Sequence, residues 1–292
     1  MEKVCFTSFV YGWYQDFIPL FIFSVLKAYP QHFVKIFLYE ELTKDTKNSL
    51  ELIKEFSTSF EVVENVKEFD AFKIPHKAAY RFLMTREYFS EFEYIYFSDI
   101  DFIVYNCNDD NFYEIYLEHC EKTGLPFSNS WNYDFGRYRM YGVQFVVKTP
   151  YFDIMDKQIQ IMKGQNKFKT QVVYNAADPS YDEEMLFYMM AHEFDLTRLL
   201  NYGRKFPGLH LAEFKMKHVF EPMLAIRRDY ETRIHPEHAK REMLIQAKID
   251  LVIKTDLFNK IFYNMSEKGQ VTLSNYCQYI RYNLPALSLN NA

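Results

Sequence analysis

Short apolar runs alternate with longer amphipathic stretches over the first two thirds of the chain. The apolar runs have the length and composition of β-strands and cover residues 4–10, 33–39, 60–63 and 94–97. The amphipathic stretches have helical spacing and cover residues 15–28, 44–56 and 76–89. Strands that alternate with helices predict βαβ units. We therefore expect an α/β fold with a Rossmann-like mixed, mainly parallel sheet flanked by helices.

The pattern changes in the later part of the chain. A strand is predicted at 141–147, followed by helices at 150–162 and 182–192. Beyond residue 222 the pattern is helical and charged, with candidate helices at 236–248, 250–263 and 272–282. No repeat or Gly/Ser linker divides the chain. We expect a main domain over residues 1–220 and a helical C-terminal extension over residues 221–292 packed on it.

Composition narrows the classes of function. The 292 residues are 49% hydrophobic, which is enough for one large core. The net charge of -5, from 34 Lys+Arg and 39 Asp+Glu, argues against nucleic acid as a partner. The most apolar run, residues 17–26, is shorter than the roughly 20 residues of a spanning helix, and the first residues do not resemble a secretory signal. The protein is expected to be cytoplasmic, with its scattered cysteines reduced.

Two acids interrupt an otherwise apolar stretch around residues 94–104. Asp99 and Asp101 are separated by one residue, so in extended backbone their carboxylates point to the same side while Ile100 faces the core. Paired carboxylates of this kind suit Mg²⁺ or Mn²⁺ shared with substrate phosphates. The alternative is a polar turn whose acids cap backbone amides. The apolar strands on both sides favour the hypothesis of a metal and diphosphate site.

At these residues the chain resembles the GT-A class of nucleotide-sugar glycosyltransferases. The resemblance is closest to two retaining families: family 8 (glycogenin and lipopolysaccharide galactosyltransferases) and family 6 (blood-group transferases). It covers about residues 4–215. It implies a nucleotide-sugar donor, UDP-linked in these families, and Mn²⁺ or Mg²⁺ held by Asp99 and Asp101.

Further segments carry the same resemblance in the same order. The segment around residues 6–26 resembles the first strand and helix of these families, and the resemblance places Tyr14 against the uracil. Residues 76–82 resemble the family's helix that reaches the donor sugar or diphosphate. A Gly-containing strand beside the donor sugar matches residues 141–145. The donor-binding residues that the resemblance implies are Phe6, Thr7, Tyr14, Lys77, Arg81, Asp99, Gly142 and Gln144.

Three acids begin the predicted helix at 182–192. They have a simple electrostatic explanation, because acids in a first turn complement the helix dipole. In family 6, however, an Asp-Glu pair at a matching helix start lies in the cleft, and this carries over to Asp182 and Glu183. Glu183 would stabilise the oxocarbenium-like transition state or act as nucleophile, and Asp182 would hold sugar hydroxyls. The sequence leaves open which retaining mechanism operates.

His210 is the strongest histidine candidate for a metal ligand. Family 8 completes its metal site with a late His, and the segment around His210 resembles it without the Gly and Lys-Pro-Trp signature that follows in the family. The alternative is a histidine that makes structural hydrogen bonds.

Each of two further segments allows two interpretations. The basic segment between Arg227 and Arg241 is either a solvated helix face or a peripheral contact with an anionic membrane. The aromatic residues between Phe127 and Tyr141 are interleaved with polar ones, so they either stack on sugars or form a packed lid.

The function expected from the sequence is metal-dependent transfer of a hexose from a nucleotide sugar to a saccharide or glycoconjugate acceptor, with retention. The donor would be UDP-galactose, UDP-glucose or an N-acetylhexosamine form. One rival is a sugar-1-phosphate nucleotidyltransferase, but the first strand lacks the Gly-rich basic loop that such enzymes use. The other rival is a non-catalytic carbohydrate- or nucleotide-binding module, against which the intact acids count.

Overall fold

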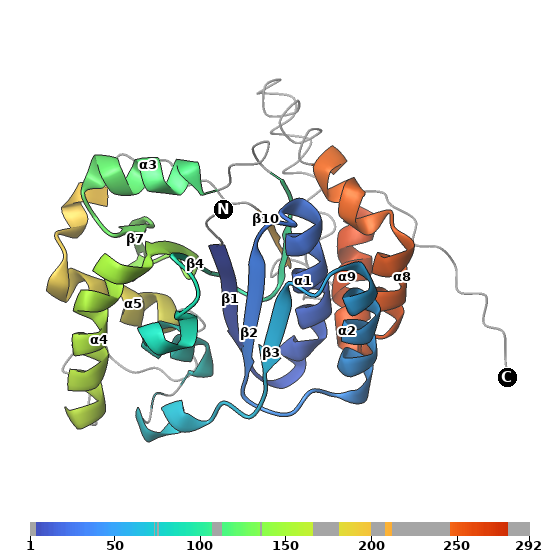
Figure 1. Cartoon of the computed structure of the whole chain (residues 1–292), viewed down its shortest axis with the longest axis horizontal. Coiled ribbons are helices and arrows are strands. Elements are labelled where there is room, and N and C mark those ends of the chain that lie inside the picture. The colour runs from blue at the N-terminus through green and yellow to red at the C-terminus, as the bar shows by residue number, and fades with distance from the viewer. Residues whose placement is uncertain are drawn as a thin grey trace, which may run out of the picture.

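A six-stranded sheet forms the centre of the molecule (Figure 1). The computed structural model describes residues 4–72, 74, 76–106, 113–134, 136–165, 181–199, 208–211 and 246–279. The strand order is β3-β2-β1-β4-β9-β6, and β9 runs antiparallel to both of its neighbours while β1, β2, β3 and β4 are parallel. The strands are β1 (Val4–Val10), β2 (Phe33–Leu38), β3 (Phe60–Val63), β4 (Tyr94–Phe97), β6 (Phe127–Ser128) and β9 (Gln144–Val147). The predicted mixed, mainly parallel sheet is confirmed.

Helices cover both faces of this sheet, and each face has its own hydrophobic core. Every residue of β1 is buried, because alternate side chains enter opposite cores. One core contains α1 (Ile18–Ala28) and α2 (Lys44–Phe56). The other contains α4 (Lys148–Gln165) and α5 (Tyr181–Glu193). Much of the aromatic content fills these two cores, so it serves packing first.

Shorter elements complete the fold. Two small two-stranded sheets pair β5 (Phe102–Val104) with β10 (Gly208–His210), and β7 (Trp131–Asp134) with β8 (Arg137–Met140). The helix α3 (Glu114–Thr123) ends at Gly124, whose φ of 63° lies in the left-handed region that glycine adopts easily. The 3₁₀ turns are η1 (Gly12–Phe17), η2 (Glu68–Phe72), η3 (Lys77–Leu83), η4 (Arg86–Phe89) and η5 (Leu196–Leu199).

The predicted helix at 76–89 is wrong: the structure has the two 3₁₀ turns η3 and η4 there. Residues 79–84 are all buried, and one α-helix would have to turn some of them toward water. The first predicted helix also begins later than expected. The α-helix starts at Ile18, since Pro19 suits a first turn where its missing N–H costs nothing.

The C-terminal helices pack on α1 and α2 (Figure 1). Residues 246–253 are helical, followed by α8 (Asp256–Tyr263) and α9 (Glu267–Tyr279). The predicted helix at 250–263 is interrupted where Thr255 caps α8 by accepting a hydrogen bond from the Phe258 amide. The expected boundary near residue 220 lies outside the described residues.

The start of α9 also contacts η1. Nζ of Lys268 lies 3.9 Å from the ring centroid of Trp13, and the Ser266 hydroxyl donates to the Asp16 carboxylate. Trp13 in turn lies against Tyr14, with ring centroids 4.7 Å apart. The C-terminal helices therefore support the segment that carries Tyr14.

Two expectations about compartment can be compared with the structure. Among the described helices, none combines the length and the apolar composition that crossing a membrane requires. Cys5, Cys120 and Cys277 are buried free thiols, and Cys107 lies outside the described residues.

Candidate active site

A pocket of about 330 Å³ opens at the carboxyl ends of β1 and β4. The chain leaves β1 toward β2 on one side, whereas β4 adds on the other side, so this is the switch point of the sheet. Open α/β sheets bind their ligands at such points. The lining residues are Ser8, Phe9, Val10, Tyr11, Tyr14, His76, Ala78, Arg81, Asp99, Ile100, Asp101, Arg139, Asp182, Glu183 and His210.

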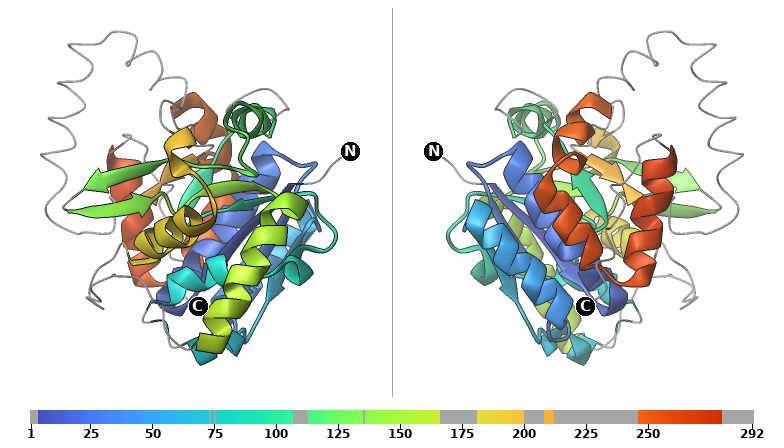
Figure 2. Two further views of the ribbon diagram at one scale, coloured as in Figure 1. Left: turned by 90° about the vertical axis from the view of Figure 1, so that its left-hand side faces the viewer. Right: turned by 90° about the vertical axis from the view of Figure 1, so that its right-hand side faces the viewer.

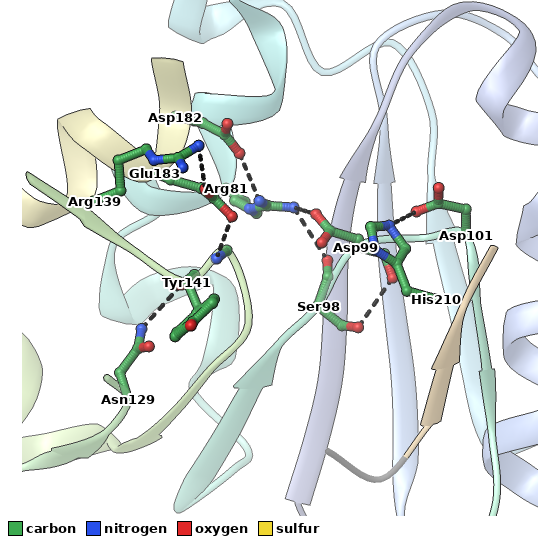
Figure 3. A network of polar contacts seen from close by, with 11 residues as sticks. Arg81, Ser98, Asp99, Asp101, Asn129, Arg139, Tyr141, Asp182, Glu183 and His210 are labelled. Carbon is green, nitrogen blue, oxygen red and sulfur yellow. Dashed lines mark hydrogen bonds and ion pairs between the residues drawn. The ribbon is translucent and has the colours of Figure 1, made fainter. Parts of the chain in front are cut away.

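A buried arginine connects two of the predicted acids (Figure 3). Arg81 on η3 is 3% exposed; its Nη1 lies 2.5 Å from Asp99 Oδ1 and its Nη2 lies 2.6 Å from Asp182 Oδ2. Burial alone would lower the pKa of Arg81, but the charges of Asp99 and Asp182 outweigh it and raise that pKa above its usual value. The guanidinium therefore stays charged and fixes the loop after β4 to the start of α5.

The acids at the start of α5 face this cluster. Burial raises the pKa of Asp182, and Arg81 opposes the rise. Burial also raises the pKa of Glu183, and the negative charges of Asp182 and Asp99 add to the effect. Glu183 accepts a hydrogen bond from the Gly142 amide at 3.4 Å and lies 3.8 Å from Nη1 of Arg139. A dipole role at the helix start does not require these contacts, so the structure adds a reason to treat both acids as site residues.

The second acid of the pair lies beside the late histidine. Oδ1 of Asp101 lies 3.2 Å from Nε2 of His210, and the Leu211 amide donates to the Asp101 carbonyl at 2.8 Å. The antiparallel pairing of β10 with β5 brings His210 here, with its ring stacked on Phe102. Asp101 and His210 thus meet at the pocket although 109 residues separate them.

The donor set at the pocket fits a divalent cation. Asp99, Asp101 and His210 are among the lining residues, and oxygen and nitrogen ligands of this kind suit Mn²⁺ or Mg²⁺. In the described part of the chain, no three His, Cys, Asp or Glu side chains are already gathered as a metal site. Asp101 and His210 are adjacent, whereas Asp99 is turned toward Arg81.

Gly142 gives the Arg81 guanidinium its space. A Cβ added at residue 142 would lie 2.5 Å from Nη2 of Arg81 and 3.5 Å from Oδ1 of Asp99. The sequence assigned this glycine to close approach of the donor sugar. In the structure, the space that the missing side chain leaves is next to Arg81.

Gly142→Ala is accordingly expected to push Arg81 out of its two ion pairs. Overpacking of this kind costs about 1–3 kcal/mol of unfolding free energy. Denaturant unfolding of the variant measures it, and the double variant with Arg81→Lys should lose less than the sum of the two single changes. Additive losses would show that the methyl group and the guanidinium do not interfere.

Several residues predicted to bind the donor lie outside the pocket. Phe6 is fully buried among Tyr29, His32 and Tyr96, because even-numbered positions of β1 face the first core. Thr7 is also fully buried, one residue before the lining begins at Ser8.

Lys77 and Gln144 do not line the pocket either. The ammonium group of Lys77 lies over the Tyr39 ring, 4.4 Å from its centroid. Gln144 is 1% exposed and accepts from Asn129 in the core side of β9. Direct contact with the donor therefore stays a prediction for Phe6, Thr7, Lys77 and Gln144, whereas Tyr14 and Arg81 do line the pocket.

Sequence reasoning missed several lining residues that carry polar groups, among them Ser8 near the end of β1. Tyr11 follows β1 directly, His76 precedes η3, and Arg139 lies on β8. His76 stands in the segment that carries the family resemblance, so its position offered a signal. For Arg139 the only signal was its alternation with Arg137 in a short strand, and this pattern does not show which face of the strand meets a cleft.

The aromatic segment before Gly142 folds into the β7–β8 hairpin. Trp131 donates from Nε1 to the Leu196 carbonyl at 2.9 Å, and Tyr138 stacks on Phe187 of α5 with centroids 5.1 Å apart. Part of the segment is thus packed. The basic segment between Arg227 and Arg241 lies outside the described residues, and so does its proposed membrane contact.

Comparisons with known proteins are remote. No protein-family model matches the sequence, and no curated protein is recognisably similar to it. Among solved structures, the chain is similar to galactosyltransferase LgtC in complex with donor and acceptor sugar analogs, at 15% identity over 57% of this chain and 66% of that chain, with a TM-score of 0.33. An active-site mutant of LgtC gives 15% identity over 58% and 67%, with a TM-score of 0.34.

A second glycosyltransferase covers nearly the whole chain. It is the glycosyltransferase GlyE in Streptococcus pneumoniae TIGR4, at 9% identity over 98% of this chain and 66% of that chain, with a TM-score of 0.45. The match thus spans about two thirds of the length of these structures. All three likenesses are remote, and only the chain's own residues can indicate its activity.

Proposed function

We propose that the protein is a glycosyltransferase that moves a hexose from a nucleotide sugar to a saccharide or glycoconjugate acceptor. The observation that carries this proposal is the grouping of Arg81, Asp99, Asp182 and Glu183 at the switch point of the sheet. A cation for phosphate, carboxylates for sugar hydroxyls and an acid beside the reacting centre are what sugar transfer from a diphosphate requires.

The pocket offers groups for each part of the donor. The rings of Tyr11 and Tyr14 form one wall, 6.2 Å apart at their centroids, and give a nucleobase aromatic surface. His76 lines the pocket, and its Nδ1 is buried without a hydrogen bond to the described protein, so a polar ligand would satisfy it. Arg81 and Arg139 are the arginines of the lining and would face a diphosphate bound there.

The charge of the lining supports metal dependence. Two arginines, Arg81 and Arg139, face four carboxylates, which leaves a formal charge of −2 if the histidines are neutral. A nucleotide diphosphate would be repelled by such a pocket unless a cation entered with it. Asp101 and His210 would hold Mn²⁺ or Mg²⁺, and Asp99, which also lines the pocket, would contribute only if Arg81 released it and turned to the phosphates. When bound, the cation would neutralise the charge that develops on the leaving diphosphate.

Glu183 is the residue proposed to act at the sugar. It lines the pocket beside Asp182, and Gly142 and Arg139 hold its carboxylate in place. Positive charge develops at the anomeric carbon as the diphosphate leaves, and an ionised Glu183 on that side would stabilise it. A carboxylate in this place is compatible with retention of configuration. Asp182 would position donor or acceptor hydroxyls while it holds Arg81.

Thermal stability measured with nucleotide sugars tests the proposal. A UDP-sugar with Mn²⁺ should raise the Tm more than either compound alone, because ligands of the native state stabilise it by mass action. Asp101→Ala should abolish this joint effect while the protein stays folded, and should reduce transfer at least about a hundredfold. Equal stabilisation in the presence of EDTA would contradict the metal assignment. No stabilisation by any nucleotide sugar would contradict the proposed function.

A further inference from the structure

Two exposed tyrosine rings lie side by side on the β7–β8 hairpin. Tyr133 is 61% exposed and Tyr138 is 41% exposed, and their ring centroids are 4.7 Å apart. Over the described ranges, the only other large hydrophobic side chains with such exposure are Phe56 and Leu251. Figure 2 shows the hairpin extending away from the central sheet. Exposed rings of this size gathered at one place indicate a binding surface.

This pair is continuous with the candidate active site. Tyr138 stacks on Phe187, which is four residues after Glu183 on α5. Residues four apart share one face of a helix, about 5–6 Å apart at their Cβ atoms. Arg139, the next residue after Tyr138, lines the pocket and contacts Glu183. Phe187, on which Tyr138 stacks, therefore lies about one helical turn from the acid proposed to act at the sugar.

The size of the pair decides between a saccharide and a protein partner. Two tyrosine side chains can bury about 150–250 Å² each, whereas a specific protein interface needs about 800 Å² on each partner. A sugar ring is small enough for such a surface, and its apolar C–H face can lie on a tyrosine ring. Asn132 and Arg137 are next to these rings in sequence, and the alternation of side chains along a strand places them on the opposite face of the hairpin.

We propose that Tyr133 and Tyr138 form a saccharide subsite that holds the acceptor beside the donor pocket. This subsite rests on the proposed function, which supplies the reaction at the neighbouring donor pocket. An acceptor that reaches from Tyr133 to Glu183 must pass the Tyr138 ring, whose centroid is 4.7 Å from that of Tyr133, and the helical turn of about 5.4 Å between Phe187 and Glu183, which together exceed one sugar ring. The acceptor class is therefore an oligosaccharide of at least two units, and a neutral one because the pocket lining has a formal charge of −2.

Binding to an array of neutral oligosaccharides tests the subsite with the full-length chain. Tyr133→Ala should lower the apparent affinity for the glycans that the wild type binds about tenfold, because it removes a stacking surface. Tyr133→Phe keeps the ring and should stay within about twofold of the wild type. Tyr133 is the residue to change because its substitution leaves the Tyr138–Phe187 stack in place. Phe56→Ala removes an exposed ring on α2 and is the matched control.

Three results would overturn the subsite. In the first, the wild type binds no oligosaccharide on the array. In the second, Tyr133→Ala binds glycans as well as the wild type. In the third, the variant differs from the wild type only in the mass measured by sedimentation, which would make the hairpin a protein interface. Stabilisation by UDP-sugar with Mn²⁺, measured on the same preparations, separates these results from failure of the proposed function. If the donor stabilises both proteins equally and only glycan binding is lost, the subsite is supported.

Discussion

Glu183→Gln is expected to reduce kcat about a thousandfold while donor affinity stays close to that of the wild type. The amide has nearly the shape of the carboxylate but no negative charge, so the electrostatic stabilisation of the transition state is lost. Its contact with the Gly142 amide can be kept through the side-chain carbonyl. Steady-state transfer rates with a UDP-sugar, together with donor-induced shifts of Tm, measure the two effects separately.

The neighbouring acid provides the control for this change. Glu184 is buried and lies 3.8 Å from Arg137, but it does not line the pocket. Glu184→Gln should therefore leave kcat within about twofold of the wild type. Equal losses in both variants would mean that the helix start as a whole matters rather than the Glu183 carboxylate.

The pH profile gives a further test of Glu183. Burial and neighbouring negative charges raise its pKa, so it takes up a proton at a higher pH than an ordinary glutamate, whose pKa is about 4.3. The acid must be ionised to act, and transfer should consequently fall as pH decreases through this raised pKa. The residual activity of Glu183→Gln should lack that acidic limb.

Arg81→Met is expected to lower the unfolding free energy by about 3–5 kcal/mol, which corresponds to a fall in Tm of about 10 °C. Methionine fills much of the space but leaves Asp182, which is 5% exposed, as a buried charge without its cation. Donor binding should also be lost, because Arg81 is one of two arginines in the pocket. Thermal and denaturant unfolding measure the stability term.

An exposed arginine with two ion pairs serves as the control. Arg86 contacts Asp153 and Asp156, but its side chain is 41% exposed, so Arg86→Met should shift Tm far less. The defect of Arg81→Met should also narrow as pH falls from neutral. Burial raises the pKa of Asp182 and Arg81 opposes the rise, so without Arg81 the pKa is higher still and protonation favours the folded variant more than the folded wild type. A pH-independent defect would show that lost packing, not the buried charge, is responsible.

The sequence predicts most of the sheet and less of what surrounds it. The strands at 4–10, 60–63 and 94–97 and the helix at 44–56 have the predicted bounds, because period and apolar content set them locally. Residues 76–89 do not form the predicted helix. The buried side chains of η3 pack between β1 and α5, and the sequence does not show that the segment is covered on both sides.

The site was predictable where a motif places its residues on one strand or one turn. Asp99 and Asp101 are close in sequence, and both line the pocket. Arg139 comes from a hairpin far along the chain, and only tertiary contacts bring it to Glu183. Phe6 was assigned to the donor by the family resemblance, but it is fully buried in the core. The consecutive residues Ser8, Phe9 and Val10 line the pocket, so depth along β1 rather than the face of the strand separates a pocket position from a core position.

The contact between α9 and η1 changes what counts as the smallest functional unit of this chain. Lys268 and Ser266 hold Trp13 and Asp16, and Trp13 lies against the Tyr14 wall of the pocket. Truncation near residue 220 would thus remove the support of that wall along with the helices themselves. Thermodynamic reciprocity also makes a ligand on Tyr14 stabilise the C-terminal helices by as much as those helices strengthen its binding. A fragment that contains only the residues of the sequence resemblance, about 4–215, would lack that coupling.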